Sequence, residues 1–118
     1  MKTKNKQQEC EDWILDVIHP NGTEERFLLE APECVLGYAE ECDLHIYEGS
    51  VSNRHAKFLR CKDGFWWLED LGSTNGTWVE NMQITAPLAL SAGMEIVFGD
   101  VEAKVLTKKK TESASFSI

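Results

Sequence analysis

The sequence lacks a long hydrophobic run, and this absence excludes a membrane-spanning helix. None of its apolar stretches approaches the ~18 residues that a helix needs to cross a bilayer. No hydrophobic segment follows the lysines near the N-terminus, so we expect no secretory signal. The sequence therefore predicts a protein of the cytoplasm, or of the nucleus in a eukaryote, that is not secreted and has no membrane partner within this chain.

Cysteine is sparse, and its spacing fits no metal site. The four cysteines include no CxxC pair, and their separations match no zinc ribbon. One CxxH pattern, Cys42-Asp-Leu-His45, would need two further ligands, and neither His19 nor His55 has a partner at ligand spacing. We therefore expect free thiols, no bound metal and no cofactor.

Basic residues are few in the body of the chain, which excludes general nucleic-acid binding. The formal net charge is −8, and residues 13–106 hold sixteen acidic against six basic side chains. Such a surface repels a polyanion such as DNA or RNA. The 42% of hydrophobic residues indicates one folded domain, because disordered chains are poor in them.

Helical periodicity is almost absent, whereas short apolar segments recur between turn residues. The pairs Asn21-Gly22 and Asp63-Gly64 are strong β-hairpin signals, and Gly99-Asp100 is typical of a third tight turn. We expect about ten short strands, at 13–18, 25–29, 34–37, 44–46, 56–60, 65–69, 77–79, 83–85, 95–98 and 101–106. The pattern therefore predicts an all-β sandwich or barrel.

The two ends of the chain differ in composition from the body. Both are polar, contain several lysines and show no periodicity. We expect a flexible leader over 1–12, one domain over 13–106 and a flexible tail or the start of a linker over 107–118. The sequence fits a whole small protein and a domain of a longer one equally well.

Two polar loops between strands are the candidate binding elements. Residues 49–55 and residues 70–77 collect hydroxyl and amide side chains where turns expose backbone N–H groups. Such clusters bind anions, but Ser, Thr and Asn also build turns that satisfy only their own backbone. The residues alone leave both interpretations open. No nucleophile is evident beside a histidine, so we expect no enzyme.

At these loops the sequence resembles the forkhead-associated (FHA) domain. The residues that carry the likeness are Gly37, Cys42-Asp43-Leu44, Val51–Ala56 (VSNRHA) and Leu68–Thr77 (LEDLGSTNGT). The likeness extends over about residues 13–106, as one domain. It implies an all-β, FHA-type β-sandwich of about eleven short, mainly antiparallel strands with its ligand loops at one end. It also implies a non-enzymatic module that binds phosphothreonine peptides.

The resemblance implies ligand contacts for five residues of the two loops. Ser52 matches the serine whose hydroxyl contacts the phosphate, and Asn53 and Arg54 occupy the next positions, which contact phosphate or peptide. Thr74 matches a residue that shapes the phosphothreonine pocket. Asn75 matches the asparagine that holds the main chain of the ligand.

Four further residues match positions that brace the loops. His55 matches a buried histidine between them, and Gly37 closes the strand before the binding end. Gly72 and Gly76 fit positions that need permissive dihedral angles or a close backbone approach. The resemblance gives these four residues a structural role.

Two positions depart from the family pattern. The family has a phosphate-binding arginine directly after this glycine, whereas Tyr38 offers one neutral hydroxyl. Arg54 is the only cation of the two loops. Glu80 replaces a bracing amide with a charge. Several acidic residues crowd the stretch around Tyr38: Glu33, Glu40, Glu41, Asp43 and Glu48.

Two functions follow from this pattern. In the first, the two loops and Tyr38 capture a phosphothreonine-bearing protein or peptide weakly. In the alternative, the chain is a phospho-independent FHA-like scaffold or assembly domain, of the kind found in bacterial secretion-apparatus proteins. We prefer the first, because the other loop residues of the family pattern are all present.

Overall fold

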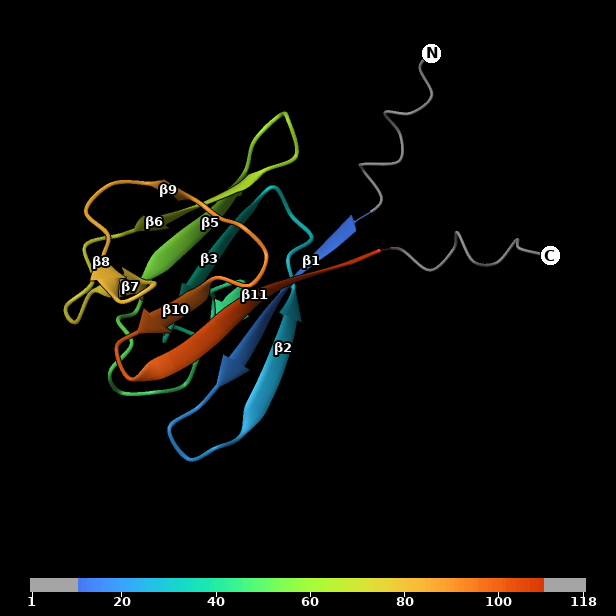
Figure 1. Cartoon of the computed structure of the whole chain (residues 1–118). Coiled ribbons are helices and arrows are strands. Elements are labelled where there is room, and N and C mark those ends of the chain that lie inside the picture. Colours follow the sequence, from blue (N-terminus) through green and yellow to red (C-terminus); the bar gives the residue numbers. More distant parts are fainter. Residues whose placement is uncertain (1–10, 110–118) are drawn as a thin grey trace, which may run out of the picture.

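The computed structural model describes residues 11–109, and these form eleven β-strands in two sheets (Figure 1). The strands are β1 (Glu11–Ile18), β2 (Glu24–Leu28), β3 (Glu33–Gly37), β4 (Leu44–His45), β5 (Ala56–Arg60), β6 (Trp66–Asp70), β7 (Thr77–Val79), β8 (Met82–Gln83), β9 (Leu88–Ala89), β10 (Glu95–Phe98) and β11 (Val101–Lys109). The all-β class that the strand pattern predicts is confirmed, and so is the sandwich of about eleven strands that the family resemblance implies.

The order of strands in the sheets brings both ends of the described chain together. One sheet has the order β2-β1-β11-β10-β7-β8, and the other has the order β4-β3-β5-β6-β9. Paired strands run antiparallel except β3 and β4, which are parallel. Glu11 pairs with Lys109, so β1 begins where β11 ends.

The core lies between the two sheets and follows from alternation along the strands. In a strand, successive side chains point to opposite faces. Trp66 is therefore 1% exposed while its neighbour Trp67 is 36% exposed. Phe58 of one sheet and Phe98 of the other meet in the middle, with ring centroids 6.3 Å apart. Burial of such large rings from both sheets stabilises the sandwich.

The predicted tight turns are present, but some strand limits differ from the prediction. Gly22, Gly64 and Gly99 all adopt positive φ, at 92°, 92° and 63°. The short strand β9 was not expected, because it has two residues and follows Pro87. β11 continues past Leu106 because its polar end pairs with β1, and such backbone pairing leaves no hydrophobic signal. The expected leader and tail fall mostly on residues 1–10 and 110–118, outside the described residues.

His19 ties the β1–β2 hairpin to the loop before β5. Its Nδ1 lies 2.8 Å from Oε2 of Glu48, and its Nε2 lies 2.9 Å from Oε1 of Glu25. The His19 side chain is 11% exposed. The hydrogen bond with Glu25 is the main cause that raises the pKa of His19, and together with Glu48 it outweighs the opposing effect of burial.

The His19 bridge predicts a pH-dependent contribution to stability. A raised pKa means that the folded state holds the proton more tightly, so the contribution is complete below the unfolded pKa of ~6.5 and is lost as pH rises through the folded pKa. We expect His19→Gln to lower the melting temperature more at about pH 6 than at about pH 8.5. Thermal denaturation at both pH values measures this, and an equal loss at both would contradict a charged bridge.

Candidate functional site

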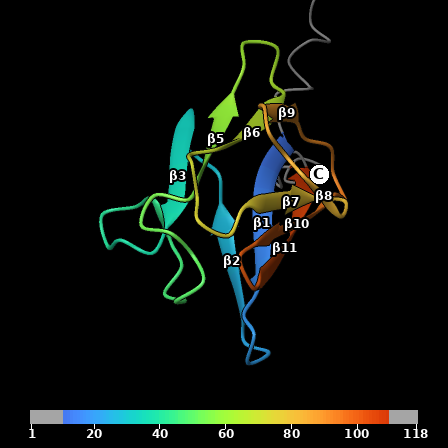
Figure 2. The same cartoon turned by 90° about the vertical axis from the view of Figure 1, so that its left-hand side faces the viewer.

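Three loops meet at one end of the sandwich, the end that faces the viewer in Figure 2. They are residues 37–43, which start at the last residue of β3, residues 49–55 before β5, and residues 70–76, which run from the last residue of β6 to β7. The amide of Tyr38 donates to the Ser52 carbonyl at 2.9 Å, which joins the first loop to the second. The side-chain amide of Asn75 donates to the Ser50 carbonyl at 2.9 Å, which joins the third loop to the second.

Gly37 allows the first loop to pack directly on the second. A Cβ at this position would lie 2.1 Å from the carbonyl oxygen of Asn53, so no side chain fits. The Cys42 thiol donates to the same carbonyl at 3.1 Å. Burial raises the pKa of the Cys42 thiol, which keeps it protonated as a donor. The backbone thereby fixes Tyr38 beside Ser52.

His55 is fully buried and connects the second loop to the third. The Ser52 amide donates to its Nδ1 at 3.0 Å, and its Nε2 donates to the Gly76 carbonyl at 2.9 Å. These two bonds assign the proton of the neutral ring to Nε2. Burial lowers the pKa of His55 and so favours this neutral form. The ring also packs edge-on against Phe98, at a centroid distance of 5.7 Å.

Asp70 organises the third loop, a role that the sequence analysis did not assign. Its carboxylate accepts hydrogen bonds from the amides of Gly72 and Ser73 at 2.9 and 3.0 Å. It also accepts the hydroxyls of Ser73 and Thr77 at 2.6 and 2.7 Å. An aspartate that bonds the backbone two residues ahead forms an Asx-turn, and this pattern was the available signal.

Replacing Asp70 with asparagine should destabilise the third loop. Burial raises the pKa of Asp70, but its four hydrogen bonds favour the carboxylate and leave the pKa below the usual value. A depressed pKa stabilises the fold above the unfolded pKa of ~3.9, and this contribution is lost as pH falls through the folded pKa. We expect Asp70→Asn to lower the melting temperature at neutral pH by about 5 °C. An unchanged melting temperature would contradict this role.

Ser52, Thr74 and Asn75 come together where the second and third loops meet. The Thr74 amide donates to Oγ of Ser52 at 3.0 Å. Among the described residues, the hydroxyl hydrogen of Ser52 has no acceptor and Oδ1 of Asn75 has no donor. Thr74 and Asn75 are exposed and Ser52 is half-buried. The junction therefore keeps hydrogen-bonding groups available to a ligand.

Asn53 and Arg54 are both exposed at the outer side of the second loop. Arg54 makes no ion pair within residues 11–109. Its positive charge reaches Cys42 of the first loop, where it lowers the thiol pKa against the larger effect of burial. Arg54 is thus a free cation near the junction of the first two loops.

Tyr38 packs against Tyr47, a residue that the sequence analysis did not single out. The two rings are stacked, with centroids 5.1 Å apart and planes 21° apart. The neighbouring Tyr47 side chain is the main cause that raises the pKa of Tyr38. The position after Gly37 therefore presents a neutral aromatic pair.

The remaining bracing positions lie in and after the third loop. Gly72 and Gly76 adopt φ of 79° and 89°, in the left-handed region that favours glycine. Glu80 and Asn81 form the β7–β8 turn with φ of 50° and 68°. The Glu80 carboxylate accepts the Glu95 amide at 2.8 Å, so the charged side chain itself holds β7 to β10.

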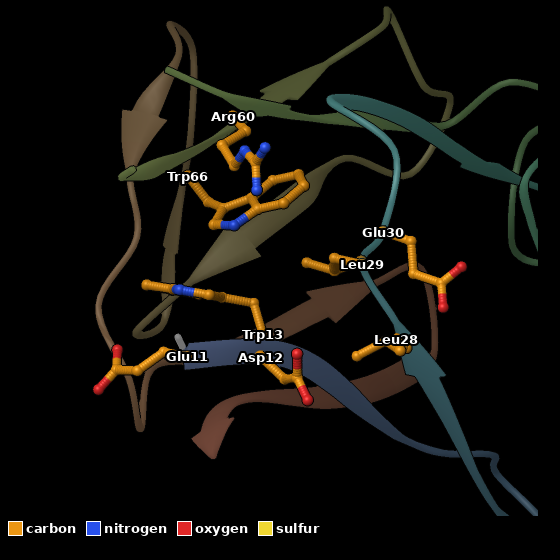
Figure 3. Close-up of a pocket in the computed structure, with 8 residues that line it drawn as sticks. All are labelled: Glu11, Asp12, Trp13, Leu28, Leu29, Glu30, Arg60 and Trp66. Atoms are coloured by element: carbon orange, nitrogen blue, oxygen red, sulfur yellow. The ribbon is translucent and has the colours of Figure 1, made fainter. Parts of the chain in front are cut away.

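A cavity of about 280 Å³ lies at the other end of the sandwich (Figure 3). Trp13 and Trp66 supply its aromatic walls, and Arg60 lies at its edge. Arg60 ends β5 and Trp66 begins β6, whereas the opposite ends of both strands adjoin the three loops. None of the predicted site residues lines this cavity.

Two structural features of other function classes are absent from residues 11–109. This part of the chain contains no group of three His, Cys, Asp or Glu side chains placed to hold a metal ion. It also contains no helix that is long and apolar enough to cross a membrane.

Curated relatives cover much of this chain. The oxoglutarate dehydrogenase inhibitor of Corynebacterium diphtheriae is 40% identical over 74 residues, which are 63% of this chain and 50% of the relative. The glycogen accumulation regulator GarA of Mycolicibacterium smegmatis is 33% identical over 89 residues, which are 75% of this chain and 55% of the relative. The chain thus spans about half the length of these curated relatives.

Solved structures share the fold, and the family model covers the binding loops. The FHA domain of the CT664 protein from Chlamydia trachomatis has a TM-score of 0.74 and 27% identity, over 80% of this chain and 96% of that one. A structure from a study of phosphothreonine-dependent FHA domain interactions has a TM-score of 0.72 and 25% identity, over 80% and 95%. The FHA domain model matches residues 34–99, more than half of the chain. The chain therefore belongs to the FHA domain family.

Proposed function

We propose that the three-loop end binds a phosphothreonine-bearing segment of a partner protein. The observation that carries this proposal is the Ser52 hydroxyl, whose oxygen accepts the Thr74 amide at 3.0 Å while its hydrogen has no acceptor within residues 11–109. The solved FHA structure that concerns phosphothreonine-dependent interactions supports it. The curated relatives are named as an inhibitor and a regulator, which fits action by binding without catalysis.

The chemistry of the loops suits a phosphate group. A phosphothreonine carries about −1.5 to −2 charges near neutral pH and three strong acceptor oxygens. Ser52 donates its hydroxyl to one oxygen, and Arg54 supplies the positive charge, with Asn53 beside it. Thr74 shapes the pocket, and Asn75 holds the ligand main chain through its side-chain amide. Tyr38 lines the edge of the pocket.

Four residues support this pocket without touching the ligand. His55 holds the second and third loops at a fixed spacing through its bonds to Ser52 and Gly76. Gly37 permits the close approach of the first loop, and Gly72 shapes the third. These residues act on affinity only through the position of the contacting groups.

We also propose that the affinity is weak, because the pocket lacks an arginine directly after Gly37. Arginine makes charge-assisted and often bidentate bonds to phosphate, whereas Tyr38 brings one neutral hydroxyl. The absence of one such cation costs about tenfold to several hundredfold in affinity. Arg54 offsets part of this loss as the free cation of the site.

We assign the binding unit to the domain expected over residues 13–106, which the paired strands β1 and β11 extend to residues 11 and 109. We place the protein in the cytoplasm, because the thiols of Cys34, Cys42 and Cys61 are free and free thiols are typical of reducing compartments.

An oriented phosphothreonine peptide library, titrated beside its unphosphorylated twin, tests the proposed function. We expect binding of the phosphorylated library alone, and we expect Ser52→Ala to abolish most of it. Ser91→Ala is the matched control, because Ser91 is exposed and lies outside the three loops. Equal binding of both libraries, or no effect of Ser52→Ala, would overturn the proposal.

A phospho-independent scaffold is the second candidate. Two features favour this function: Tyr38 brings no positive charge where the family has an arginine, and the acidic residues around it repel a phosphate. Binding that ignores phosphorylation in the library titration would select it.

A further inference from the structure

The stacked tyrosines form an aromatic surface that the fold itself does not use. Tyr38 and Tyr47 stack at 5.1 Å, and Tyr47 is 71% exposed. Neither ring belongs to the hydrophobic core or to the partly buried residues packed against it. A pair of rings with an open face can bind a further group, whereas a single exposed ring is common on protein surfaces.

The backbone places this pair at the margin of the phosphothreonine pocket. The Tyr38 amide bonds the Ser52 carbonyl at 2.9 Å. On the other side, the Ile46 amide bonds the Gly37 carbonyl at 2.9 Å, which holds Tyr47 beside the first loop. A ligand that bonds the Ser52 hydroxyl therefore passes close to the tyrosine pair.

The charges on the chain segment that carries the pair are of one sign. Residues 27–53 contain no lysine or arginine. Glu40 and Glu41 are exposed in the loop that follows Tyr38, and neither makes an ion pair within residues 11–109. The faces of tyrosine rings attract cations through the ring quadrupole. Unpaired carboxylates beside such rings add to that attraction and disfavour an acidic group.

We infer that Tyr38 and Tyr47 form an aromatic shelf that binds a lysine or arginine side chain of the partner segment, a few residues from its phosphothreonine. This inference rests on the proposed function and adds the chemistry of the partner to it. The phosphate contacts Ser52 and Arg54, while the basic side chain lies over the rings and near the acidic loop. The preferred partner thus carries a negative phosphate that faces Arg54 and a positive side chain that faces the tyrosine pair and the acidic loop, so the charges of partner and site are complementary.

Peptides that differ only beside the phosphothreonine test the shelf. One series carries lysine or arginine at the flanking positions, a second carries leucine and a third carries glutamate. We expect wild-type protein to bind the basic series about fivefold more tightly than the leucine series, and the glutamate series least. Tyr47→Ala should remove the preference for the basic series and keep the binding of the leucine series.

Two further variants separate the shelf from the general acidity of the protein. Tyr47→Phe keeps an aromatic face and should retain the preference. Phe65→Ala removes an exposed ring from the β5–β6 turn and should change nothing. A basic preference that persists in Tyr47→Ala, or equal binding of all series by wild type, would overturn the shelf and leave the proposed function standing. If wild type binds none of the phosphorylated series, the proposed function itself fails, and the inference fails with it.

Discussion

Replacing Tyr38 with arginine should strengthen binding of a phosphothreonine peptide with neutral flanks at least tenfold. The present pocket presents hydroxyl groups, amide groups and one cation, Arg54, to the phosphate. It does so within a chain of net charge −8. A guanidinium after Gly37 would add a full charge and a planar fork of donors. Isothermal titration of wild type and Tyr38→Arg with one peptide measures the gain.

Salt and a second substitution identify the source of that gain. The gain in affinity should shrink as ionic strength rises, because dissolved ions screen part of the attraction between the guanidinium and the phosphate. Adding Ser52→Ala to Tyr38→Arg should remove much of the restored affinity. The variant should also lose the preference for basic flanks, because one ring of the shelf is gone. If Tyr38→Arg binds no phosphopeptide at all, the pocket is closed to phosphate and the scaffold function becomes the better account.

Replacing His55 with alanine should destabilise the domain by about 2–4 kcal/mol and lower its melting temperature by roughly 10 °C. The substitution empties a fully buried position and leaves the Ser52 amide and the Gly76 carbonyl without their partners. Thermal and urea denaturation measure the loss. His45→Ala is the matched control, because Nε2 of His45 has no hydrogen-bond partner within the described residues, so a smaller effect is expected there.

The pH dependence of stability gives this prediction a second readout. The folded state lowers the pKa of His55, so the unfolded state takes up its proton first as pH falls below ~6.5. The contribution of neutral His55 to the free energy of unfolding is therefore complete above that pH and declines below it. This pH trend is opposite to that of His19, whose contribution declines as pH rises. The difference in melting temperature between wild type and His55→Ala should therefore be smaller at about pH 5.5 than at about pH 7.5. An unchanged melting temperature at neutral pH would contradict the buried bridge.

The fold was predictable from sequence because its signals are local. Asn21-Gly22 and Asp63-Gly64 mark hairpins whatever the rest of the chain does, and alternation within β11 marks its buried face. The two-residue strand β9 carries no such signal, because its pairing with β6 is decided by tertiary packing.

The binding site could be predicted only in part from the sequence. The loop residues could be named from the family resemblance, but their distances depend on contacts between distant segments. The approach of Gly37 to the Asn53 carbonyl and the stacking of Tyr38 on Tyr47 arise across the β3–β4 and β3–β5 pairs, and no periodicity encodes them. Asp70 was the avoidable omission, because its bonds to the next residues are local.

Residue-resolved NMR titration of the wild-type chain tests the central claim most directly. A phosphothreonine peptide and its unphosphorylated twin are added separately, and backbone and side-chain amide shifts are followed. The account predicts that the phosphorylated peptide alone shifts the resonances of Ser52, Arg54, Thr74 and Asn75, and leaves those of the distant cavity near Trp13 in place. Equal shifts with both peptides, or shifts confined to residues outside the three loops, would contradict it.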